Sequence, residues 1–250
     1  MEKEKVAVFI TVFNEEKVLE DLLSFIDDSY DLYVVDDGSN DRTGDIAKRG
    51  GAEVISHPIN MGQGITVLTA FKLLAKKDYD IIVEMDGDGQ HDPREIPRFI
   101  DKIRETGTDI VAGSRLLGTN YEGAPFARRL FLSPLTWVLN RLTGYSISDS
   151  MCGFRAFKGS ALKSAAHLFD DMAEPEYIAS EMWIKFARAS LTAGEVPIRL
   201  AGRKHGVSYK GLFRYARGVI ATIIRSKLET YKHKYKNNRV NADNNRRQEA

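Results

Sequence analysis

Three oxygen-bearing side chains stand at every second position after a short apolar run. They are Asp86, Asp88 and Gln90, and they alternate with Gly87 and Gly89. Residues two apart on an extended chain point the same way, so the three side chains can converge on one point. Clustered carboxylates repel one another unless a cation lies between them. Oxygen ligands suit Mg²⁺ or Mn²⁺, which keep open positions for phosphate oxygens. The pattern therefore predicts a divalent-metal site that binds phosphate groups.

Two other interpretations of the same stretch require less chemistry. An EF-hand loop begins with a similar alternation of acids, but its sixth and twelfth positions are Gly and Glu, where this chain has His91 and Pro97. A polar turn without any ligand is the second, because a single Asp-x-Asp pair is common. His91 is a candidate metal ligand or a neighbour of the ligands, and the histidines expected at the surface are His57, His167 and His233.

Apolar and amphipathic runs must form the elements that position these residues. Five short apolar runs predict strands, and helical patterns lie between them. Strands that alternate with helices predict an α/β fold, with a mostly parallel twisted sheet and helices on both faces. The predicted strands are 6–11, 32–35, 52–55, 81–83 and 110–112, and the predicted helices are 17–25, one after Thr43, 65–76, 93–105, 130–142 and one containing Glu181 and Trp183.

Polar clusters follow four of the predicted strands. Ligands of such sheets bind at the carboxyl ends of the strands. Each cluster alone could be a helix cap or a turn, but their shared position predicts one ligand site. The chain has no Gly-x-Gly-x-x-Gly after the first strand and no Gly-Lys-Ser/Thr loop, which excludes the usual dinucleotide and P-loop sites. The clusters are Asn14 and Glu15, Asp36 and Asp37, 86–90, and Ser114 and Arg115.

The composition suits a soluble globular protein whose charge is unevenly spread. The 250 residues are 43% hydrophobic and 28% charged, and the net charge is +1. Residues 203–250 hold 13 Lys and Arg against 3 Asp and Glu, which indicates a basic tail that meets an anionic surface. The start has no signal-peptide layout, and no apolar run approaches the roughly 20 residues that span a bilayer. Cys152 is the single cysteine, consistent with a reducing compartment.

Eight short segments occur in order over most of the chain: 11–15, 35–43, 60–64, 85–93, 113–115, 153–157, 195–198 and 203–208. Together they resemble the family-two glycosyltransferases of the GT-A fold, and more closely the polyprenyl-phosphate sugar synthases such as dolichyl-phosphate mannose and glucose synthases. The chain departs from that pattern at Val12, where the family has Pro, at Gln63, where it has a basic residue, and at Cys152, where it has Ser.

The resemblance implies that a nucleotide-sugar donor lies across the ends of the first strands. Phe13 and Glu15 would contact the base and ribose, and Asp36 or Asp37 would read the base edge. The metal ligands would be Asp86, Asp88 and Gln90, and the cofactor Mg²⁺ or Mn²⁺. UDP-sugars are favoured over GDP-mannose. The whole implied donor-binding set is Thr11, Phe13, Asn14, Glu15, Asp36, Asp37, Asn60, Gly62, Gln63, Asp86 and Gly87.

The resemblance also implies a polyprenyl phosphate as the acceptor, with transfer by inversion. Arg115 joins Asp86 and Asp88 in the catalytic set, because guanidinium groups suit phosphate. A phosphate monoester is already mostly ionised at neutral pH and needs no catalytic base. A solvated basic turn is the other interpretation of Arg128 and Arg129. The implied acceptor-phosphate residues are Arg115, Arg129, Ser133, Arg203 and Ser208.

Three alternatives remain open. A family-two enzyme with a hydroxyl acceptor would need a base, which an acid between Asp170 and Glu181 could supply. A non-catalytic lipid-phosphate-binding subunit would not need Asp86 and Asp88. A nucleotidyltransferase would need a Gly-rich loop after the first strand, which this chain lacks.

The chain is expected to divide into three parts. Residues 1–210 would form the catalytic domain, 211–236 a basic amphipathic helix on a membrane surface, and 237–250 a disordered polar tail. The apolar stripe of that helix could instead pack on the catalytic domain or a second copy. We expect a cytoplasmic protein, peripheral on the inner face of the membrane, without a nucleic-acid partner; the oligomeric state stays open. The stripe is Phe213, Ala216, Ile220, Ile224, Leu228, Tyr231 and Tyr235.

Overall fold

The structure is a computed structural model. It describes residues 3–117, 126–170, 172 and 178–202, and six residues nearer the C-terminus: 218, 220–222, 224 and 225. For residues 126–132 it describes the backbone alone. Most of the predicted membrane-surface helix 211–236, all of the tail 237–250 and residues 203–210 of the predicted catalytic domain lie outside the described residues.

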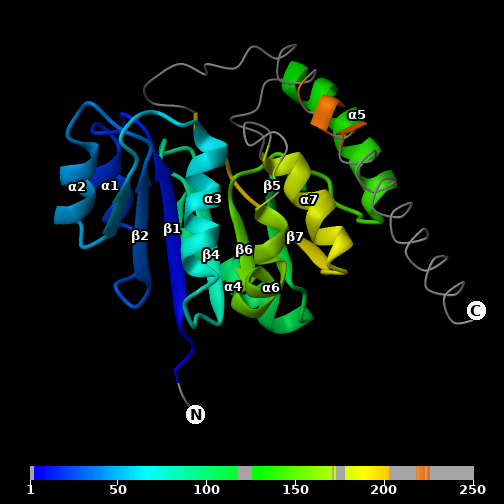
Figure 1. The fold of residues 1–250 in the computed structure, drawn as a ribbon, viewed down its shortest axis with the longest axis horizontal. Helices are drawn as coiled ribbons and strands as arrows, with labels where there is room; N and C mark the ends of the chain where they lie inside the picture. The colour runs from blue at the N-terminus through cyan, green and yellow to red at the C-terminus, as the bar shows by residue number, and fades with distance from the viewer. Residues whose placement is uncertain are drawn as a thin grey trace, which may run out of the picture.

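A seven-stranded sheet runs through the middle of the molecule (Figure 1). Its order is β3-β2-β1-β4-β6-β5-β7. Four of its six strand pairs are parallel, and β6 is antiparallel to both of its neighbours. The predicted mostly parallel sheet is therefore confirmed. The strands are β1 Val6–Val12, β2 Asp31–Asp36, β3 Glu53–Ser56, β4 Ile81–Asp86, β5 Ile110–Ser114, β6 Arg155–Lys158 and β7 Ala193–Pro197.

The antiparallel strand β6 was not predicted, and it shapes the edge of the sheet where the ligand site is predicted. Because β6 runs against its neighbours, its N-terminal end lies at the edge where the parallel strands have their carboxyl ends. The segment that precedes Arg155 therefore enters the sheet beside the ends of β4 and β5.

Helices cover both faces of the sheet, as predicted (Figure 1). One apolar cluster joins one face to α1, α2 and α4, and the other joins the opposite face to α3, α5, α6 and α7. Strands buried on both faces read as continuous apolar runs, as β1 does. The helices are α1 Leu19–Leu23, α2 Thr43–Arg49, α3 Gln63–Leu74, α4 Ile96–Thr106, α5 Phe126–Thr143, α6 Gly159–Ala165 and α7 Ile178–Arg188. Two 3₁₀ helices are η1 Pro93–Glu95 and η2 Ala166–Phe169.

Local chemistry explains where the helix after the metal-candidate stretch begins and ends. Asp92 caps η1, since its side chain accepts a hydrogen bond from the Arg94 amide at 3.0 Å, and Pro93 stands at the first helical position. Gly107 ends α4 in the left-handed conformation, with a φ of 66°. The predicted helix 93–105 is therefore a short 3₁₀ turn that continues directly as α4.

Within the described ranges, no helix is both long enough and apolar enough to cross a membrane.

Candidate active site

The turn after β1 is bound to the turn after β2. The Asn14 amide donates to Ser39 Oγ at 2.9 Å, and the Asn40 amide donates to Asn14 Oδ1 at 2.9 Å. The Glu15 amide donates to Thr43 Oγ1 at 2.8 Å. Asn14 takes a positive φ of 55°, which asparagine tolerates better than most residues. These bonds fix the backbone at Asn14 and Glu15, next to and at the predicted base and ribose contacts Phe13 and Glu15.

Asp36, the last residue of β2, and the next residue, Asp37, have different partners. Asp36 Oδ1 accepts from the amide and hydroxyl of Ser39, at 3.0 and 2.5 Å. Asp37 reaches the next loop: its Oδ1 accepts from the Met61 amide at 2.9 Å and its Oδ2 from the Gly62 amide at 2.8 Å. Asp37 therefore positions the 60–62 loop, which carries two of the predicted donor contacts.

The prediction that His57 lies at the surface was wrong. Its side chain is only 11% exposed. The Nδ1 atom lies 2.9 Å from Asp37 Oδ1, and Nε2 lies 2.9 Å from Thr69 Oγ1. The imidazole thus connects the Asp37 carboxylate to α3, and it stabilises the same loop. His167 is exposed, as predicted.

Asp86 ends β4 and faces the start of α3. Gln63 Nε2 donates to Asp86 Oδ1 at 2.8 Å. The next acid, Asp88, accepts from the Gln90 amide through Oδ1 at 3.1 Å. The Gln90 side-chain nitrogen lies 3.3 Å from the Ala201 carbonyl oxygen, beside the last described residues before the 203–208 segment. Asp86 thus lies against the loop that Asp37 holds.

Glycine leaves the space that Asp86 occupies. A Cβ atom at Gly153 would stand 2.3 Å from Asp86 Oδ2. A Cβ atom at Gly87 would stand 2.4 Å from Val12 Cγ1 and 3.0 Å from the Thr11 carbonyl oxygen. Real atoms do not approach so closely, so any larger residue at either position would displace Asp86 or the end of β1.

Asp86 and Asp88 suit a hard divalent cation that takes most of its ligands from water and phosphate. No group of three or more His, Cys, Asp or Glu side chains comes together as a metal site among the residues that the structure describes. Mg²⁺ in phosphate-transfer sites is bound by one or two carboxylates, with the remaining positions filled by water and phosphate oxygens. Asp86 and Asp88 supply that number of carboxylates. Because Gly153 has no side chain, the Asp86 carboxylate has room beside it.

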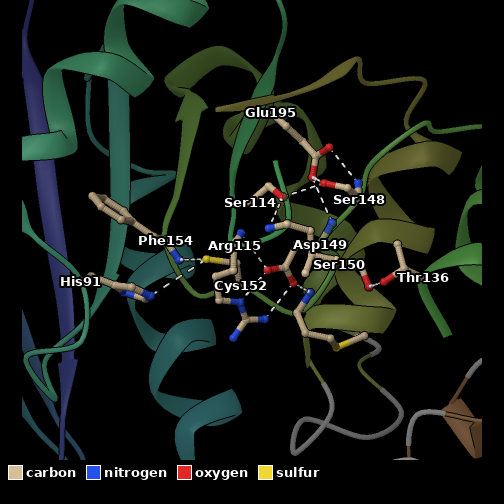
Figure 2. Close-up of polar contacts among 12 residues, drawn as sticks. His91, Ser114, Arg115, Thr136, Ser148, Asp149, Ser150, Cys152, Phe154 and Glu195 are labelled. Carbon is tan, nitrogen blue, oxygen red and sulfur yellow. Dashed lines mark hydrogen bonds and ion pairs between the residues drawn. The ribbon is translucent and has the colours of Figure 1, made fainter. Parts of the chain in front are cut away.

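Arg115 follows β5 and is fixed by an acid that the sequence analysis missed (Figure 2). Arg115 Nε donates to Asp149 Oδ2 at 2.5 Å, and Nη2 donates to Oδ1 at 2.7 Å. The Arg115 amide also donates to Oδ2, at 3.2 Å. The Arg115 side chain is 10% exposed and the Asp149 side chain 4%. One signal could have found Asp149: it is the single charged residue between 142 and 154.

Both partners of this pair stay charged. Burial by itself lowers the pKa of Arg115, but the hydrogen bonds and charge of Asp149 raise it above its usual range. Burial by itself raises the pKa of Asp149, and the Arg115 guanidinium holds it below its usual range. Asp86 also raises the pKa of Arg115, so the arginine lies within electrostatic reach of the metal-candidate carboxylate.

His91 and Cys152 are buried side chains that contact each other near Arg115 (Figure 2). His91 is buried, its ring stacks on Phe154 at 5.2 Å between centroids, and its Nε2 lies 4.0 Å from Cys152 Sγ. Burial lowers the pKa of His91, against the opposing effect of Asp86 and Asp88. Burial raises the pKa of the Cys152 thiol to about 12. Both side chains are therefore neutral near pH 7, and Cys152 carries no reactive thiolate.

The other predicted acceptor residues are described only in part. Ser133 is exposed on α5, the helix that also carries Arg129. The Arg129 side chain, Arg203 and Ser208 lie outside the described residues. Two acids from the alternative catalytic-base segment are described and paired with lysines: Asp170 with Lys72 at 2.9 Å, and the buried Glu181 with Lys185 at 3.4 Å.

The comparisons with known proteins agree on one family. The model of glycosyl transferase family 2 matches residues 7–165. The UDP-N-acetylglucosamine–dolichyl-phosphate N-acetylglucosaminyltransferase of Methanococcus voltae is 30% identical over 213 residues, which cover 77% of this chain and 84% of that enzyme. The undecaprenyl-phosphate mannosyltransferase of Micrococcus luteus is 29% identical, with 82% of this chain and 86% of that enzyme covered.

The solved structures agree on the fold. Glucosyl-3-phosphoglycerate synthase from Mycobacterium tuberculosis, in complex with Mn²⁺, uridine diphosphate and glucosyl-3-phosphoglycerate, matches with a TM-score of 0.66. The two chains are 22% identical, and the match covers 89% of this chain and 80% of that one. The likeness confirms the fold predicted from the sequence.

Proposed function

Because the chain belongs to glycosyl transferase family 2, we propose that it transfers a sugar from a nucleotide-sugar to a polyprenyl phosphate. The observation that carries the proposal is the arrangement at the carboxyl edge of the sheet. Asp86 accepts a hydrogen bond from Gln63, next to the 60–62 loop, and the paired guanidinium of Arg115 lies within electrostatic reach of Asp86. Such an edge can hold two phosphorylated substrates side by side. Relatives named for dolichyl and undecaprenyl phosphate support this choice of acceptor.

The donor half of the proposed site consists of loops that hydrogen bonds hold in place. Phe13 and Glu15 contact the base and ribose, and Asp36 contacts the base edge. Asp37 contributes by fixing the 60–62 loop, so that Asn60, Gly62 and the adjoining Gln63 would face the diphosphate. Thr11 and Gly87 would lie beneath the diphosphate, and a side chain at Gly87 would not fit against the end of β1. A site that is ordered before the donor binds loses less conformational freedom on binding.

Asp86, Asp88 and the side-chain oxygen of Gln90 would hold Mg²⁺ or Mn²⁺, which supplies positive charge for the nucleoside diphosphate as it leaves. The solved relative of the same fold has been crystallised with Mn²⁺ and UDP-glucose and with Mg²⁺ and UDP, which supports a divalent cation and a uridine nucleotide. Asp86 is already aimed at the donor side, since it accepts a hydrogen bond from Gln63.

In the acceptor half, Arg115 binds the polyprenyl phosphate, and one phosphate oxygen attacks the sugar carbon with inversion. The second pKa of a phosphate monoester is about 6, so the nucleophile is ionised at pH 7 without a protein base. The two described acids of the 170–181 segment are paired with lysines, which fits a reaction that uses neither as a base. Ser133, Arg129, Arg203 and Ser208 complete the proposed phosphate site.

The acceptor is a membrane lipid, so the active site must work at a bilayer surface. We place the protein on the inner face of the membrane as a peripheral protein, attached through the basic C-terminal segment. The net positive charge of residues 203–250 supports attachment to anionic lipid.

The test is a panel of UDP- and GDP-sugars incubated with undecaprenyl or dolichyl phosphate, with Mn²⁺ or with a chelator, and read by mass spectrometry of the lipid. We expect one UDP-sugar to give a glycosyl phosphate lipid only when Mn²⁺ or Mg²⁺ is present. Transfer to a hydroxyl acceptor with none to the lipid phosphate would contradict the proposed acceptor. Absence of nucleoside diphosphate release with every donor and acceptor would contradict catalysis itself.

A further inference from the structure

Glu195 of β7 binds the segment that carries Asp149 (Figure 2). Its Oε2 atom accepts from the Ser148 amide at 2.7 Å. Its Oε1 atom accepts from the Asp149 amide at 3.0 Å and from Ser148 Oγ at 3.1 Å. One carboxylate thus satisfies two consecutive backbone amides, and it uses a different oxygen for each.

The same contacts continue to the end of β5. Ser148 Oγ lies 2.6 Å from Ser114 Oγ, and Ser114 is fully buried. Ser114 Oγ in turn accepts from the Leu116 amide at 3.0 Å, so it bridges the residues on either side of Arg115. Strands β5 and β7 are parallel neighbours, with Glu195 opposite Ala112, three residues before Arg115. Glu195 therefore lies further from the carboxyl edge of the sheet than Arg115. It contacts the Asp149 amide directly, and it reaches the backbone around Arg115 through Ser148 and Ser114.

We propose that Glu195 is a positioning residue for the acceptor phosphate and acts through Asp149 on Arg115. This inference rests on the proposed function, in which Arg115 binds that phosphate. An arginine side chain has many rotamers, and a fixed guanidinium loses little freedom when phosphate binds. Asp149 can fix both edge nitrogens of Arg115 only while its own backbone stays where Glu195 holds it.

The number of acceptor oxygens makes this role testable with a small substitution. Glutamine at 195 keeps the size of the side chain but offers one carbonyl oxygen for two amides that now use two oxygens. Its amide nitrogen would face an N–H donor, and two donors cannot hydrogen bond to each other. Glu195→Gln should therefore let the 148–149 segment shift without emptying the core.

Asp109 provides a matched control on the same two strands. It precedes β5, and its Oδ2 accepts from the Thr192 amide at 2.8 Å and from Thr192 Oγ1 at 2.7 Å, just before β7. Asp109 thus connects β5 to β7 at the opposite end of the sheet from Arg115. Asp109→Asn removes a carboxylate charge between the same two strands, as Glu195→Gln does, but its one carbonyl oxygen can still accept both Thr192 contacts, and Arg115 stays in place.

The experiment uses the full chain and measures steady-state transfer to undecaprenyl phosphate. Glu195→Gln should raise the acceptor KM by about tenfold, the size of one weakened charge-assisted contact, and change the donor KM by less than about twofold. Asp109→Asn should change neither KM by more than about twofold. In an Arg115→Lys background, Glu195→Gln should add no further change, because the group through which it acts is gone. An equal rise in both backgrounds, no rise at all, or an equal effect of Asp109→Asn would overturn the proposal.

A second readout separates this inference from the proposed function. The Arg115 Nε–H, bound to Asp149, should exchange slowly with solvent by nitrogen-15 NMR in the wild type and in Asp109→Asn, and faster in Glu195→Gln. If Arg115→Lys leaves the acceptor KM unchanged while this exchange responds to Glu195, the proposed acceptor site is wrong and the positioning link stands. Unchanged exchange would refute the link. If Glu195→Gln does not fold, Ser148→Ala replaces it, because that change removes only the hydroxyl contacts to Glu195 and Ser114. Faster exchange of the Arg115 Nε–H in Ser148→Ala would support the link, and unchanged exchange would refute it.

Discussion

Asp149 holds the Arg115 guanidinium through two hydrogen bonds, 2.5 Å to Nε and 2.7 Å to Nη2, with both side chains almost fully buried. Removing one partner of a buried ion pair leaves the other charge without compensation. Asp149→Ala should therefore lower the free energy of unfolding by about 3–5 kcal/mol, measured by urea denaturation at pH 7. Glu16→Ala removes a more exposed pair with Arg42 and should cost no more than about 1 kcal/mol. If both variants lowered the free energy of unfolding equally, burial of the Arg115–Asp149 pair would not be what makes its loss costly.

The same pair should show a defined pH dependence. The folded pKa of Asp149 lies below that of an ordinary carboxyl group because Arg115 outweighs the effect of burial. Its stabilisation is therefore fully present above the unfolded pKa of about 4 and is lost as the pH falls through the folded pKa. The difference in unfolding free energy between wild type and Asp149→Asn should stay constant from pH 7 to about 5 and narrow below about 4. Urea titrations over that range test it, and a difference that narrows only above pH 7 would have the wrong sign.

Metal dependence is expected to reside in the strand-end acids. Asp88→Ala should lower the rate of transfer at least about a hundredfold, because a ligand of the charge-neutralising cation is lost. This loss corresponds to several kcal/mol of transition-state stabilisation. Circular dichroism and the thermal midpoint should change little, since Asp88 follows β4 in a half-buried bend that belongs to no helix or strand. Full wild-type activity in excess chelator would refute metal dependence altogether.

Gly153 should matter because of Asp86 and not because of its own backbone. A methyl group at 153 would come within 2.3 Å of Asp86 Oδ2, so Gly153→Ala should push that carboxylate aside. We expect Mn²⁺ affinity, measured by calorimetry with UDP present, to fall at least about tenfold, as when groups that orient a metal ligand are lost. Gly194→Ala is the control, since its nearest contact would be an ordinary 3.5 Å to Thr108 Oγ1. Unchanged Mn²⁺ binding by Gly153→Ala would show that Asp86 can move without consequence.

Part of this site could be predicted from the sequence because its residues follow strands directly. Asp36, Asp37 and Asp86 end or follow apolar runs, and parallel strands bring such ends to one edge. Asp149 and Glu195 could not be paired in this way. Asp149 lies in an irregular segment before β6, a four-residue strand too short to show a pattern, and Glu195 is one position in a half-buried strand.

His57 shows the same limit in another form. An isolated histidine after a short strand reads as a surface residue. Its burial depends on Asp37 and Thr69, which lie 20 residues before it and 12 residues after it. Contacts of this kind are set by how the elements pack, and no local pattern encodes them.

The last prediction concerns the proposed membrane attachment. Ile220 and Ile224 lie one helical turn apart and are 47% and 56% exposed, whereas Thr222 is buried. Positions two apart on a helix point about 200° apart, so the side with Thr222 packs inward and the isoleucine pair faces outward. Arg225 is exposed beside that pair, where it can meet anionic headgroups.

Ile220→Ser combined with Ile224→Ser should therefore weaken binding to anionic vesicles by at least about tenfold. Each half-exposed isoleucine has about 1 kcal/mol of apolar burial left to gain in a bilayer. Flotation of the full chain with vesicles that contain phosphatidylserine measures it, and raised salt should weaken binding further. Ile59→Ser, at a still more exposed isoleucine between β3 and α3, is the control. An equal loss of vesicle binding for Ile59→Ser would indicate nonspecific hydrophobic adsorption. Undiminished flotation of the double variant would show that this helix face packs elsewhere, on the catalytic domain or on a second copy.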